Sequence, residues 1–374
     1  MRVLFVSLLR AGDFIMQVPL LKSQGANSEI HILVNDEFSQ LKELYPEYHF
    51  HFFPRKHLQA VINDPKSSLL KPFEVLKYTT AQLNQLNFTK IYNLTHNRIS
   101  GFLMDQLQAS EKHGLVFADD HFVPFKNSWH SFFNSTFSEN KRSSHHYLTA
   151  LAQSVDLGIP QISVVEDRTQ KKSIYFQAFT SDSKKNWHLS QWRELFDRVS
   201  SARPDMQVQI LASPLEATTL AAHFPSDRIL VCSLSEARDK LKNSALLVTG
   251  DTSLAHLAAE TQTPVLVLSL GSSDFTKTMP WLQGAWVLSS EVPCAPCLHS
   301  SACPQSQHLC GQSLKVTTVL NVVAGILTNK YMFSVASPER LVRMEYQFKS
   351  GLKPVSASLT RREVGNIEQN PDLF

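Results

Sequence analysis

The sequence predicts an α/β protein made of two nucleotide-binding-type domains, each built on a parallel β-sheet. The stretch from Leu246 to Gly271 has the pattern of a strand, a tight turn, a helix and a second strand. The first 22 residues repeat this pattern, with an apolar strand, a turn at Gly12-Asp13 and an apolar helix. Strand-like and helix-like runs alternate through most of the chain, which predicts parallel sheets covered by helices on both faces.

In the first half, short apolar runs predict five strands, at Arg2–Leu9, Glu29–Val34, His49–Phe53, Lys90–Leu94 and Gly114–Phe117. Longer runs between them predict crossover helices at Phe14–Lys22, Glu37–Leu44, Lys71–Leu86 and Ile99–Leu107. Residues Asp119–Arg142 interrupt this alternation, because they are rich in Phe, His, Asn and Ser and show no clean period. A helix at His145–Leu157 and a Gly158-Ile-Pro160 turn follow. We place the domain boundary at the polar linker Glu166–Lys172.

In the second half, the predicted strands are Ser173–Phe179, Gln207–Leu211, Arg228–Val231, Ala245–Thr249 and Val265–Leu270. The predicted helices are Ser190–Val199, Leu215–His223, Ser235–Leu241 and Leu254–Glu260. The tail after Lys330 is polar, and we expect a helix at Pro338–Lys349 that packs back on the first domain. The expected domains are therefore 1–165 and 166–330, with a tail at 331–374.

Length and composition describe a globular protein of two domains. The chain has 374 residues, of which 43% are hydrophobic and 18% charged. A net charge of +3 permits contact with phosphorylated substrates or an acidic membrane surface, and it is too small to indicate a nucleic-acid partner. No stretch reaches the ~20 apolar residues of a membrane helix. We expect a cytoplasmic protein, with its five cysteines mostly reduced.

Five motifs, in this order, resemble the bacterial ADP-heptose:lipopolysaccharide heptosyltransferase family over roughly residues 1–328. They are Gly12-Asp13, Asn93-Leu-Thr-His96-x-Arg98, Lys185-Asn-Trp187, Asp251-Thr252-x-x-x-His256, and Cys294-x-Pro-Cys297 followed by Cys303, His308 and Cys310. The resemblance implies a GT-B fold, in which two Rossmann-like open-sheet domains face a central cleft. It also implies inverting transfer of a heptose from ADP-heptose to an inner-core lipopolysaccharide acceptor.

Asp13 is the candidate general base. A carboxylate at a helix start just after a strand lies where open α/β sheets bind ligands. The alternative from the residues alone is a helix N-cap, which Asp often provides. The resemblance favours the base, because a sugar hydroxyl is a poor nucleophile until a positioned carboxylate accepts its proton.

Lys185 is the candidate cation for the leaving diphosphate. It follows Thr180 and Ser181 just beyond a predicted strand, where hydroxyl and ammonium groups gather. A fixed ammonium stabilises the growing negative charge of a leaving diphosphate, although a loop lysine is usually just solvated. The resemblance selects Lys185 over Lys184 and implies that Thr180 and Ser181 contact phosphate.

Asp251, Thr252, Ser253 and His256 surround a second helix start, which suits a phosphate. The alternatives are an N-cap and a satisfied helical histidine. The resemblance implies that this turn holds the donor sugar and diphosphate. The family usually has glycine at the position of Ser253, and a side chain there narrows the space beside the ligand.

Glu216 follows another predicted strand, and two interpretations of it remain open. Its carboxylate either accepts hydrogen bonds from the hydroxyls of a ribose, or it lies in the first turn of a helix and interacts favourably with the dipole of that helix.

The cysteines at 294, 297, 303 and 310 have the spacing C-x2-C-x5-C-x6-C. Three interpretations remain open: a structural zinc site, reduced thiols that simply pack in the fold, and a disulfide. Zinc is not assigned because the spacing between the second pair of cysteines is wider than in common zinc modules. We assign no metal and no cofactor.

Asn93, His96 and Arg98 are the candidate acceptor contacts, with Lys141, Arg142, His145 and His146 as expected neighbours. Such a set either binds an acidic core sugar or phosphate, or is a solvated charge cluster.

Three rival functions remain to be weighed. An NAD-dependent oxidoreductase would need Gly-x-Gly-x-x-Gly at the first turn, and this turn has one glycine and an acid. A glycosyltransferase of the same fold with another nucleotide-sugar donor is the first alternative. A non-catalytic relative that binds nucleotide-sugar or glycolipid is the second, and the presence of both Asp13 and Lys185 argues against it. The expected partners are a nucleotide sugar and a glycan acceptor, with peripheral contact at the inner face of the inner membrane as an option.

Overall fold

The computed structural model describes residues 1–25, 27–68, 70–118, 121–123, 128–138, 143, 145–330, 339–344, 346–348, 357–359 and 362–363. These residues divide into two compact units. The first holds Met1–Ser138 and Tyr147–Gln161, and the second holds the chain from Ile162 together with Ser143, His145 and His146. The division falls a few residues before the predicted linker at Glu166–Lys172. Among the described residues, no helix is long and apolar enough to cross a membrane.

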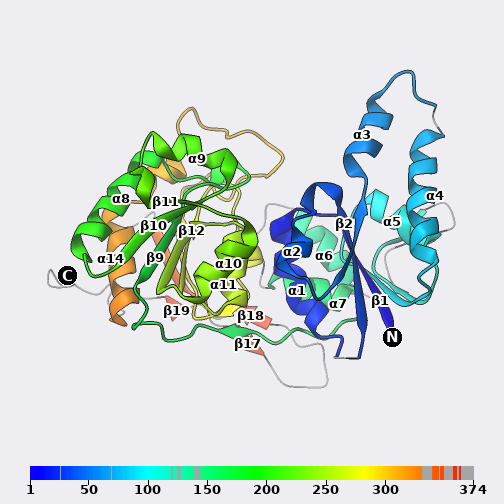
Figure 1. Cartoon of the computed structure of the whole chain (residues 1–374), viewed down its shortest axis with the longest axis horizontal. Coiled ribbons are helices and arrows are strands. Elements are labelled where there is room, and N and C mark those ends of the chain that lie inside the picture. Colours follow the sequence, from blue (N-terminus) through cyan, green and yellow to red (C-terminus); the bar gives the residue numbers. More distant parts are fainter. Residues whose placement is uncertain are drawn as a thin grey trace. The chain divides into compact units, whose positions relative to one another are not determined.

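The first unit is a five-stranded parallel sheet in the order β3-β2-β1-β4-β5, wrapped by helices (Figure 1). The strands are β1 Arg2–Ser7, β2 Glu29–Asn35, β3 His49–Phe53, β4 Phe88–Asn93 and β5 Ala109–His113. The helices are α1 Ala11–Lys22, α2 Leu41–Leu44, α3 Arg55–Asn63, α4 Lys71–Asn84, α5 Arg98–Gln106, α6 Ser128–Ser138 and α7 Tyr147–Ser154, with the 3₁₀ turn η1 Asp36–Phe38. The short strands β6 Val116–Ala118 and β7 His121–Val123 form a separate antiparallel pair.

The second unit has a larger sheet in the order β11-β10-β9-β12-β13-β15-β16-β19. Its parallel strands are β9 Ser173–Gln177, β10 Gln207–Ala212, β11 Ile229–Val231, β12 Leu246–Gly250, β13 Val265–Ser269 and β15 Trp286–Ser290. The antiparallel strands β16 Glu339–Arg343 and β19 Arg362–Glu363 extend it. Two further pairs are β8 Ser163–Val164 with β14 Leu282–Gln283, and β17 Tyr346–Phe348 with β18 Ala357–Leu359.

The helices of the second unit cover both faces of its sheet. They are α8 Leu189–Ala202, α9 Pro214–Ala221, α10 Leu234–Lys242, α11 Ser253–Glu260, α12 Phe275–Thr278, α13 Leu309–Ser313 and α14 Val316–Thr328, with the 3₁₀ turns η2 Ser183–Lys185 and η3 Ser226–Arg228. Helices α8 and α14 share one apolar core with the strands, and α10 and α11 cover the other face (Figure 1). Because both faces are covered, the central strands are buried throughout, as the apolar runs predict.

The alternating α/β architecture with two parallel sheets is confirmed, and three local predictions are wrong. The fifth strand of the first sheet is β5 at Ala109–His113, not Gly114–Phe117. The aperiodic segment contains helix α6. The described part of the tail forms β16 in the second sheet and not a helix at Pro338–Lys349, because Leu341 and Val342 lie opposite β15. Pro338 itself lies outside the described residues.

Candidate functional site

In the first unit, the strand order changes direction between β1 and β4. Open α/β sheets bind ligands at the carboxyl ends of the two strands that flank such a change. Asp13 follows β1, while His96 and Arg98 follow β4. The side chain of Thr95 ties the two strand ends together, since its Oγ1 accepts from Leu8 N at 2.8 Å and donates to the Val6 carbonyl at 3.2 Å. The sheet therefore brings the predicted base and two predicted acceptor contacts to one edge.

Asp13 lies inside the first turn of α1 and not at the N-cap. Arg10 is the N-cap residue, and Asp13 Oδ2 accepts a hydrogen bond from its backbone N–H at 3.2 Å. A carboxylate has about four acceptor sites, so this bond orients the half-buried group and is compatible with proton acceptance. One turn further, Gln17 accepts from Ser7 Oγ at 2.7 Å and donates to the Leu94 carbonyl at 3.2 Å. These bonds fix the start of α1 against β1 and the end of β4.

Asn93 was predicted to contact the acceptor, but in the structure its side chain stabilises the fold. The side chain is fully buried, and its amide donates to Ser100 Oγ at 3.1 Å and to the Leu115 carbonyl at 2.8 Å. Its carbonyl oxygen accepts from Thr95 N at 3.0 Å. Asn93 thus shapes the turn that carries the next residues.

The other two predicted acceptor contacts differ in accessibility, because both ring nitrogens of His96 are buried whereas Arg98 is exposed. The His96 ring stacks on Phe133 with 4.1 Å between centroids, and in the described part of the chain neither ring nitrogen has a hydrogen-bond partner. Burial, together with the neighbouring His130, lowers the pKa of His96 to about 3, so the ring is neutral at pH 7. Arg98 is exposed at the first residue of α5. A neutral ring suits a sugar hydroxyl, and a guanidinium suits an acidic group.

The expected cationic neighbours, Lys141, Arg142, His145 and His146, are not shown to be cations that belong to the first unit. His146 belongs to the second unit, where it is buried and donates from Nε2 to the Met279 carbonyl at 2.7 Å. Burial lowers the pKa of His146 to about 3, and burial also lowers the pKa of His145. Both histidines are therefore uncharged at neutral pH. Lys141 and Arg142 lie outside the described residues.

In the second unit, the strand order changes direction between β9 and β12. Residues 180–185 follow β9, and residues 251–256 follow β12. The two loops approach closely at Gly250, where an added Cβ would lie 2.8 Å from Thr180 Cγ2. Glycine at this position is what allows the loops to meet. The predicted donor contacts at 180–185 and 251–256 are thus brought together at one sheet edge.

Lys185 and Asp251 form an ion pair at the centre of this edge. Lys185 Nζ lies 2.9 Å from Asp251 Oδ2, and their side chains are 14% and 8% exposed. Burial pushes the pKa of Asp251 up, but the charges of Lys185 and His256 and hydrogen bonds from Lys185 and Ser273 outweigh it and hold that pKa below its usual value. Burial lowers the pKa of His256 to about 4. The edge therefore presents one ammonium, one carboxylate and one neutral imidazole.

The start of α11 is open to an anion. Thr252 is the N-cap residue, but its side chain makes no capping hydrogen bond to the helix. Its hydroxyl lies 3.2 Å from Thr249 Oγ1 instead. Backbone N–H groups at a helix start bind phosphate well, because they have no partner within the helix and the helix dipole favours negative charge. Ser253 is the first helical residue and is half-buried.

The other predicted donor contacts make local bonds. Thr180 Oγ1 donates to the Asp182 carbonyl at 2.7 Å, and Ser181 is exposed next to it. Glu216 lies in the first turn of α9, where its Oε2 accepts from Ser213 N at 2.7 Å. The helix-start role of Glu216 is thus present in the structure, and its ribose role stays a prediction.

Lys184 differs sharply from Lys185. Its ammonium donates to the carbonyls of Leu298, His299 and Ser301, with distances of 2.8 Å to Leu298 and 3.0 Å to His299. It therefore anchors the cysteine-rich loop, residues 291–308 between β15 and α13, to the 3₁₀ turn η2 that follows β9. Ser273, which bonds Asp251, is a site residue that the sequence interpretation missed. The signal for it is the polar run Gly271-Ser-Ser-Asp274 directly after β13.

The three cysteines of this loop, at 294, 297 and 303, and Cys310 in α13 are free thiols, of which Cys310 is buried and Cys303 is exposed. Cys310 Sγ lies 3.1 Å from His308 Nε2. Within the described residues, three ligand atoms from His, Cys, Asp or Glu come within 4.8 Å of one another only at Glu29, His31 and His49. The loop thus has no preformed three-ligand group.

Comparison with known proteins identifies the architecture. The model of glycosyltransferase family 9, described as heptosyltransferases, matches residues 79–307. No curated protein matches the chain.

Solved structures align over most of the chain. A family 9 glycosyltransferase from Veillonella parvula is 13% identical, with a TM-score of 0.60, covering 88% of this chain and 97% of that one. E. coli heptosyltransferase WaaC with ADP is 16% identical, with a TM-score of 0.59, covering 87% and 100%. E. coli ADP-heptose LPS heptosyltransferase II is 15% identical, with a TM-score of 0.60, covering 88% and 99%. These likenesses confirm the predicted GT-B fold class.

Proposed function

This chain belongs to glycosyltransferase family 9, the heptosyltransferase family, and we propose that it transfers a heptose from ADP-heptose to an inner-core lipopolysaccharide acceptor. The observation that carries the proposal is the Lys185–Asp251 pair beside the open start of α11. A helix N-terminus and a fixed ammonium both attract the negative charge of a diphosphate. The E. coli relatives whose structures hold ADP or an ADP-heptose analogue support an adenine nucleotide.

In the proposed reaction, an acceptor hydroxyl attacks C1 of the heptose from the side opposite the diphosphate. The bond from C1 to the diphosphate oxygen breaks, a bond from C1 to the acceptor oxygen forms, and ADP leaves. Asp13 accepts the hydroxyl proton, and Lys185 with the N–H groups of α11 stabilises the charge that develops on ADP. The anomeric centre is inverted, because attack and departure occur on opposite faces.

Five further residues of the site have a part in this proposal. Asp251 orients Lys185 and accepts from a sugar hydroxyl, and neutral His256 offers a ring nitrogen that has no protein partner in the described part of the chain. Glu216 follows β10, next to β9, and is proposed to accept from the ribose. On the acceptor side, Arg98 is proposed to bind an acidic group and His96 a hydroxyl. The first unit would thus bind the acceptor and the second the nucleotide sugar.

A panel of nucleotide sugars tests the donor. We expect ADP and ADP-heptose to raise the melting temperature of the full chain more than UDP-, GDP- or CMP-sugars do, because a ligand at 100 times its Kd stabilises by about 2.7 kcal/mol. If another nucleotide sugar raises the melting temperature more than ADP-heptose does, that nucleotide sugar is the donor and the proposal of ADP-heptose is wrong. No shift with any of them, together with no transfer, would favour a non-catalytic relative.

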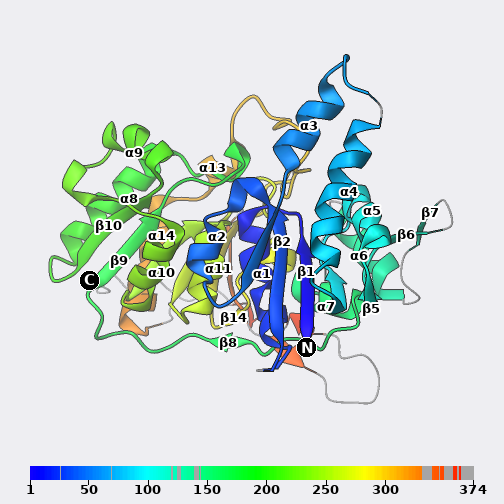
Figure 2. The same cartoon turned by 45° about the vertical axis from the view of Figure 1, so that its right-hand side comes forward.

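The helical hairpin α3–α4, residues 55–84, is the surface we propose for peripheral contact with an anionic membrane. It extends away from the sheet of the first unit in both views (Figures 1 and 2). Ile62, Leu70 and Phe73 are 57%, 68% and 60% exposed around its tip. The hairpin has five Lys or Arg residues and two Asp or Glu residues, so its net charge is +3. This is as large as the net charge of the whole chain. Apolar side chains between lysines suit a lipid surface.

Vesicle binding tests this surface. We expect the chain to sediment with vesicles containing phosphatidylglycerol and not with phosphatidylcholine alone. Lys66→Gln with Lys71→Gln should weaken binding by about 30-fold, since each lysine near an anionic surface contributes about 1 kcal/mol. The control is Leu215→Ser, which removes the 93% exposed leucine of the second unit and should change nothing. If Leu70→Ser with Phe73→Ser instead converts a dimer to a monomer without changing vesicle binding, the hairpin binds a second copy and not a membrane.

A further inference from the structure

A cluster of imidazoles and a carboxylate lies at the amino ends of β2 and β3, on one face of the first sheet. Glu29 and His31 alternate along β2, and His49 and His51 alternate along β3. Residues two apart on a strand share a face, and His31 lies directly opposite His49 in the parallel register. Four potential metal ligands therefore meet at one place. None of them takes part in the proposed transfer.

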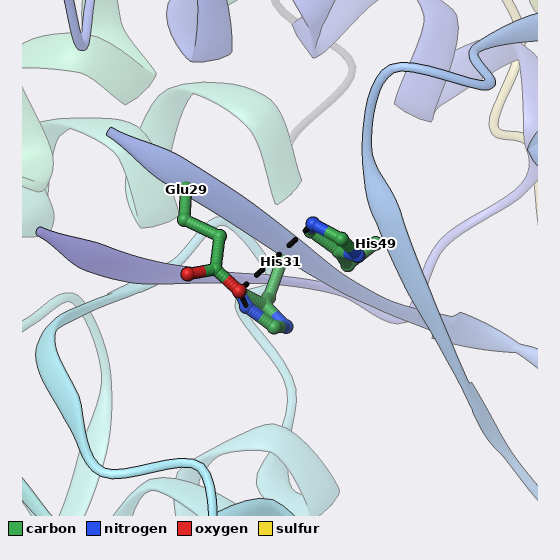
Figure 3. A group of neighbouring side chains, drawn as sticks. All are labelled: Glu29, His31 and His49. Atoms are coloured by element: carbon green, nitrogen blue, oxygen red, sulfur yellow. Dashed lines mark hydrogen bonds and ion pairs between the residues drawn. The ribbon is translucent and has the colours of Figure 1, made fainter. Parts of the chain in front are cut away.

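Three of these side chains already point toward a common centre (Figure 3). Glu29 Oε1 lies 3.0 Å from His31 Nε2 and 3.9 Å from His49 Nε2, and the three ligand atoms lie within 4.8 Å of one another. Two ligands of a tetrahedral zinc, each about 2.0–2.1 Å from the metal, lie about 3.3–3.4 Å apart. The distances from Glu29 Oε1 to the two imidazole nitrogens, 3.0 and 3.9 Å, lie on either side of this ligand–ligand distance. Glu29 and His49 are 41% and 58% exposed, so their side chains have room to adjust.

Outer contacts hold the cluster in place. His31 is only 5% exposed, and its ring lies between those of His49 and His51, at centroid distances of 4.8 and 5.2 Å. His31 Nδ1 lies 2.9 Å from His51 Nε2, and Arg2 Nε donates to Glu29 Oε2 at 3.0 Å. Metal-bound histidines usually hydrogen-bond through their other ring nitrogen, and ligating carboxylates are themselves hydrogen-bonded. His51 and Arg2 provide these supports to His31 and Glu29.

We propose that Glu29, His31 and His49 bind one divalent transition-metal ion, with Zn²⁺ as the best match and water completing its coordination. Two imidazoles and a carboxylate are a common zinc ligand set, and the nitrogen donors favour a transition metal over Mg²⁺ or Ca²⁺. The site lies at the amino ends of the parallel strands, whereas Asp13 and His96 follow their carboxyl ends. The ion therefore has a structural role, in which it joins the edge strand β3 to β2.

Zinc titration of the full chain after metal removal tests the site. We expect calorimetry to find one zinc equivalent whose affinity falls at least tenfold in His49→Ala and in Glu29→Gln. Zinc should also raise the melting temperature of the unchanged chain and not that of His49→Ala. The control is His57→Ala, which removes an exposed histidine of α3 outside the cluster and should leave binding unchanged.

The cysteine-rich loop is the competing zinc site, and two results separate it from this cluster. Cys294→Ser with Cys297→Ser should retain the zinc equivalent that His49→Ala loses. Co²⁺ bound in place of zinc should lack the near-ultraviolet charge-transfer band that thiolate ligands give. If the double cysteine variant loses the zinc and His49→Ala keeps it, the ion belongs to the loop and the proposal is wrong. Binding that neither change alters would also overturn it.

Discussion

Replacing Asp13 by Asn is expected to abolish sugar transfer while donor affinity stays unchanged. Asn keeps an oxygen that accepts from Arg10 N, so the first turn of α1 is preserved. It cannot accept the acceptor's proton, and losing a positioned base costs on the order of 10²–10⁴ in rate. ADP release measures turnover, and calorimetry with ADP measures donor binding.

Asp36→Asn is the matched control for this change. Asp36 begins the 3₁₀ turn directly after β2, the neighbour of β1, and is half-buried like Asp13. Its replacement should leave turnover close to that of the unchanged chain. Near-normal turnover of Asp13→Asn would remove Asp13 as the base. A lower melting temperature together with lost donor binding would instead give Asp13 a structural role at the helix start.

The central strands of both sheets were predictable because they are buried on both faces. Such strands appear in the sequence as short apolar runs, and β9, β10, β12 and β13 all lie at predicted positions. The added strand β16 was not predictable in this way. Its partner is β15, which is also absent from the predicted elements, so the pairing that makes residues 339–343 a strand is invisible locally.

Helix α6 was missed for a different reason. Its sequence from Ser128 to Ser138 is rich in Ser and aromatic residues, which have weak helix propensity. In the fold, Phe133 stacks on His96 and meets the ring of Tyr147 at 5.2 Å between centroids. Tertiary packing therefore stabilises a helix that the local sequence does not favour.

The positions of the site residues follow from strand order, but their charges and partners do not. The sequence places Asp13, Lys185 and Asp251 after strands, and the sheets bring each to an edge where the strand order reverses. Burial then makes His96 and His256 neutral, which no sequence pattern shows. The difference between Lys184 and Lys185 is likewise set by the carbonyls of a loop more than a hundred residues away.

Replacing Lys185 by Met is expected to weaken ADP binding and to lower turnover, the latter on the order of 10²–10³-fold, as for loss of one fixed group that stabilises transition-state charge. Met has nearly the length of Lys, so packing is retained while the ammonium is removed. The change also leaves Asp251 buried without its partner, which raises the pKa of that carboxyl. Lys185→Met combined with Asp251→Asn removes this second effect. Calorimetry with ADP and a transfer assay measure both quantities in each variant.

Lys184→Met separates diphosphate binding from loop anchoring. The two lysines are adjacent, yet Lys184 Nζ bonds three carbonyls of the cysteine-rich loop and Lys185 Nζ bonds Asp251. Lys184→Met should therefore lower the melting temperature, because three carbonyls of the loop lose their donor, while the folded protein keeps its ADP affinity. Lys185→Met with Asp251→Asn should show the reverse pattern, a retained melting temperature and a lost affinity. If ADP binding instead depends on Lys184 and survives the change at Lys185, the diphosphate lies against the loop, and the proposed assignment of the two lysines is inverted.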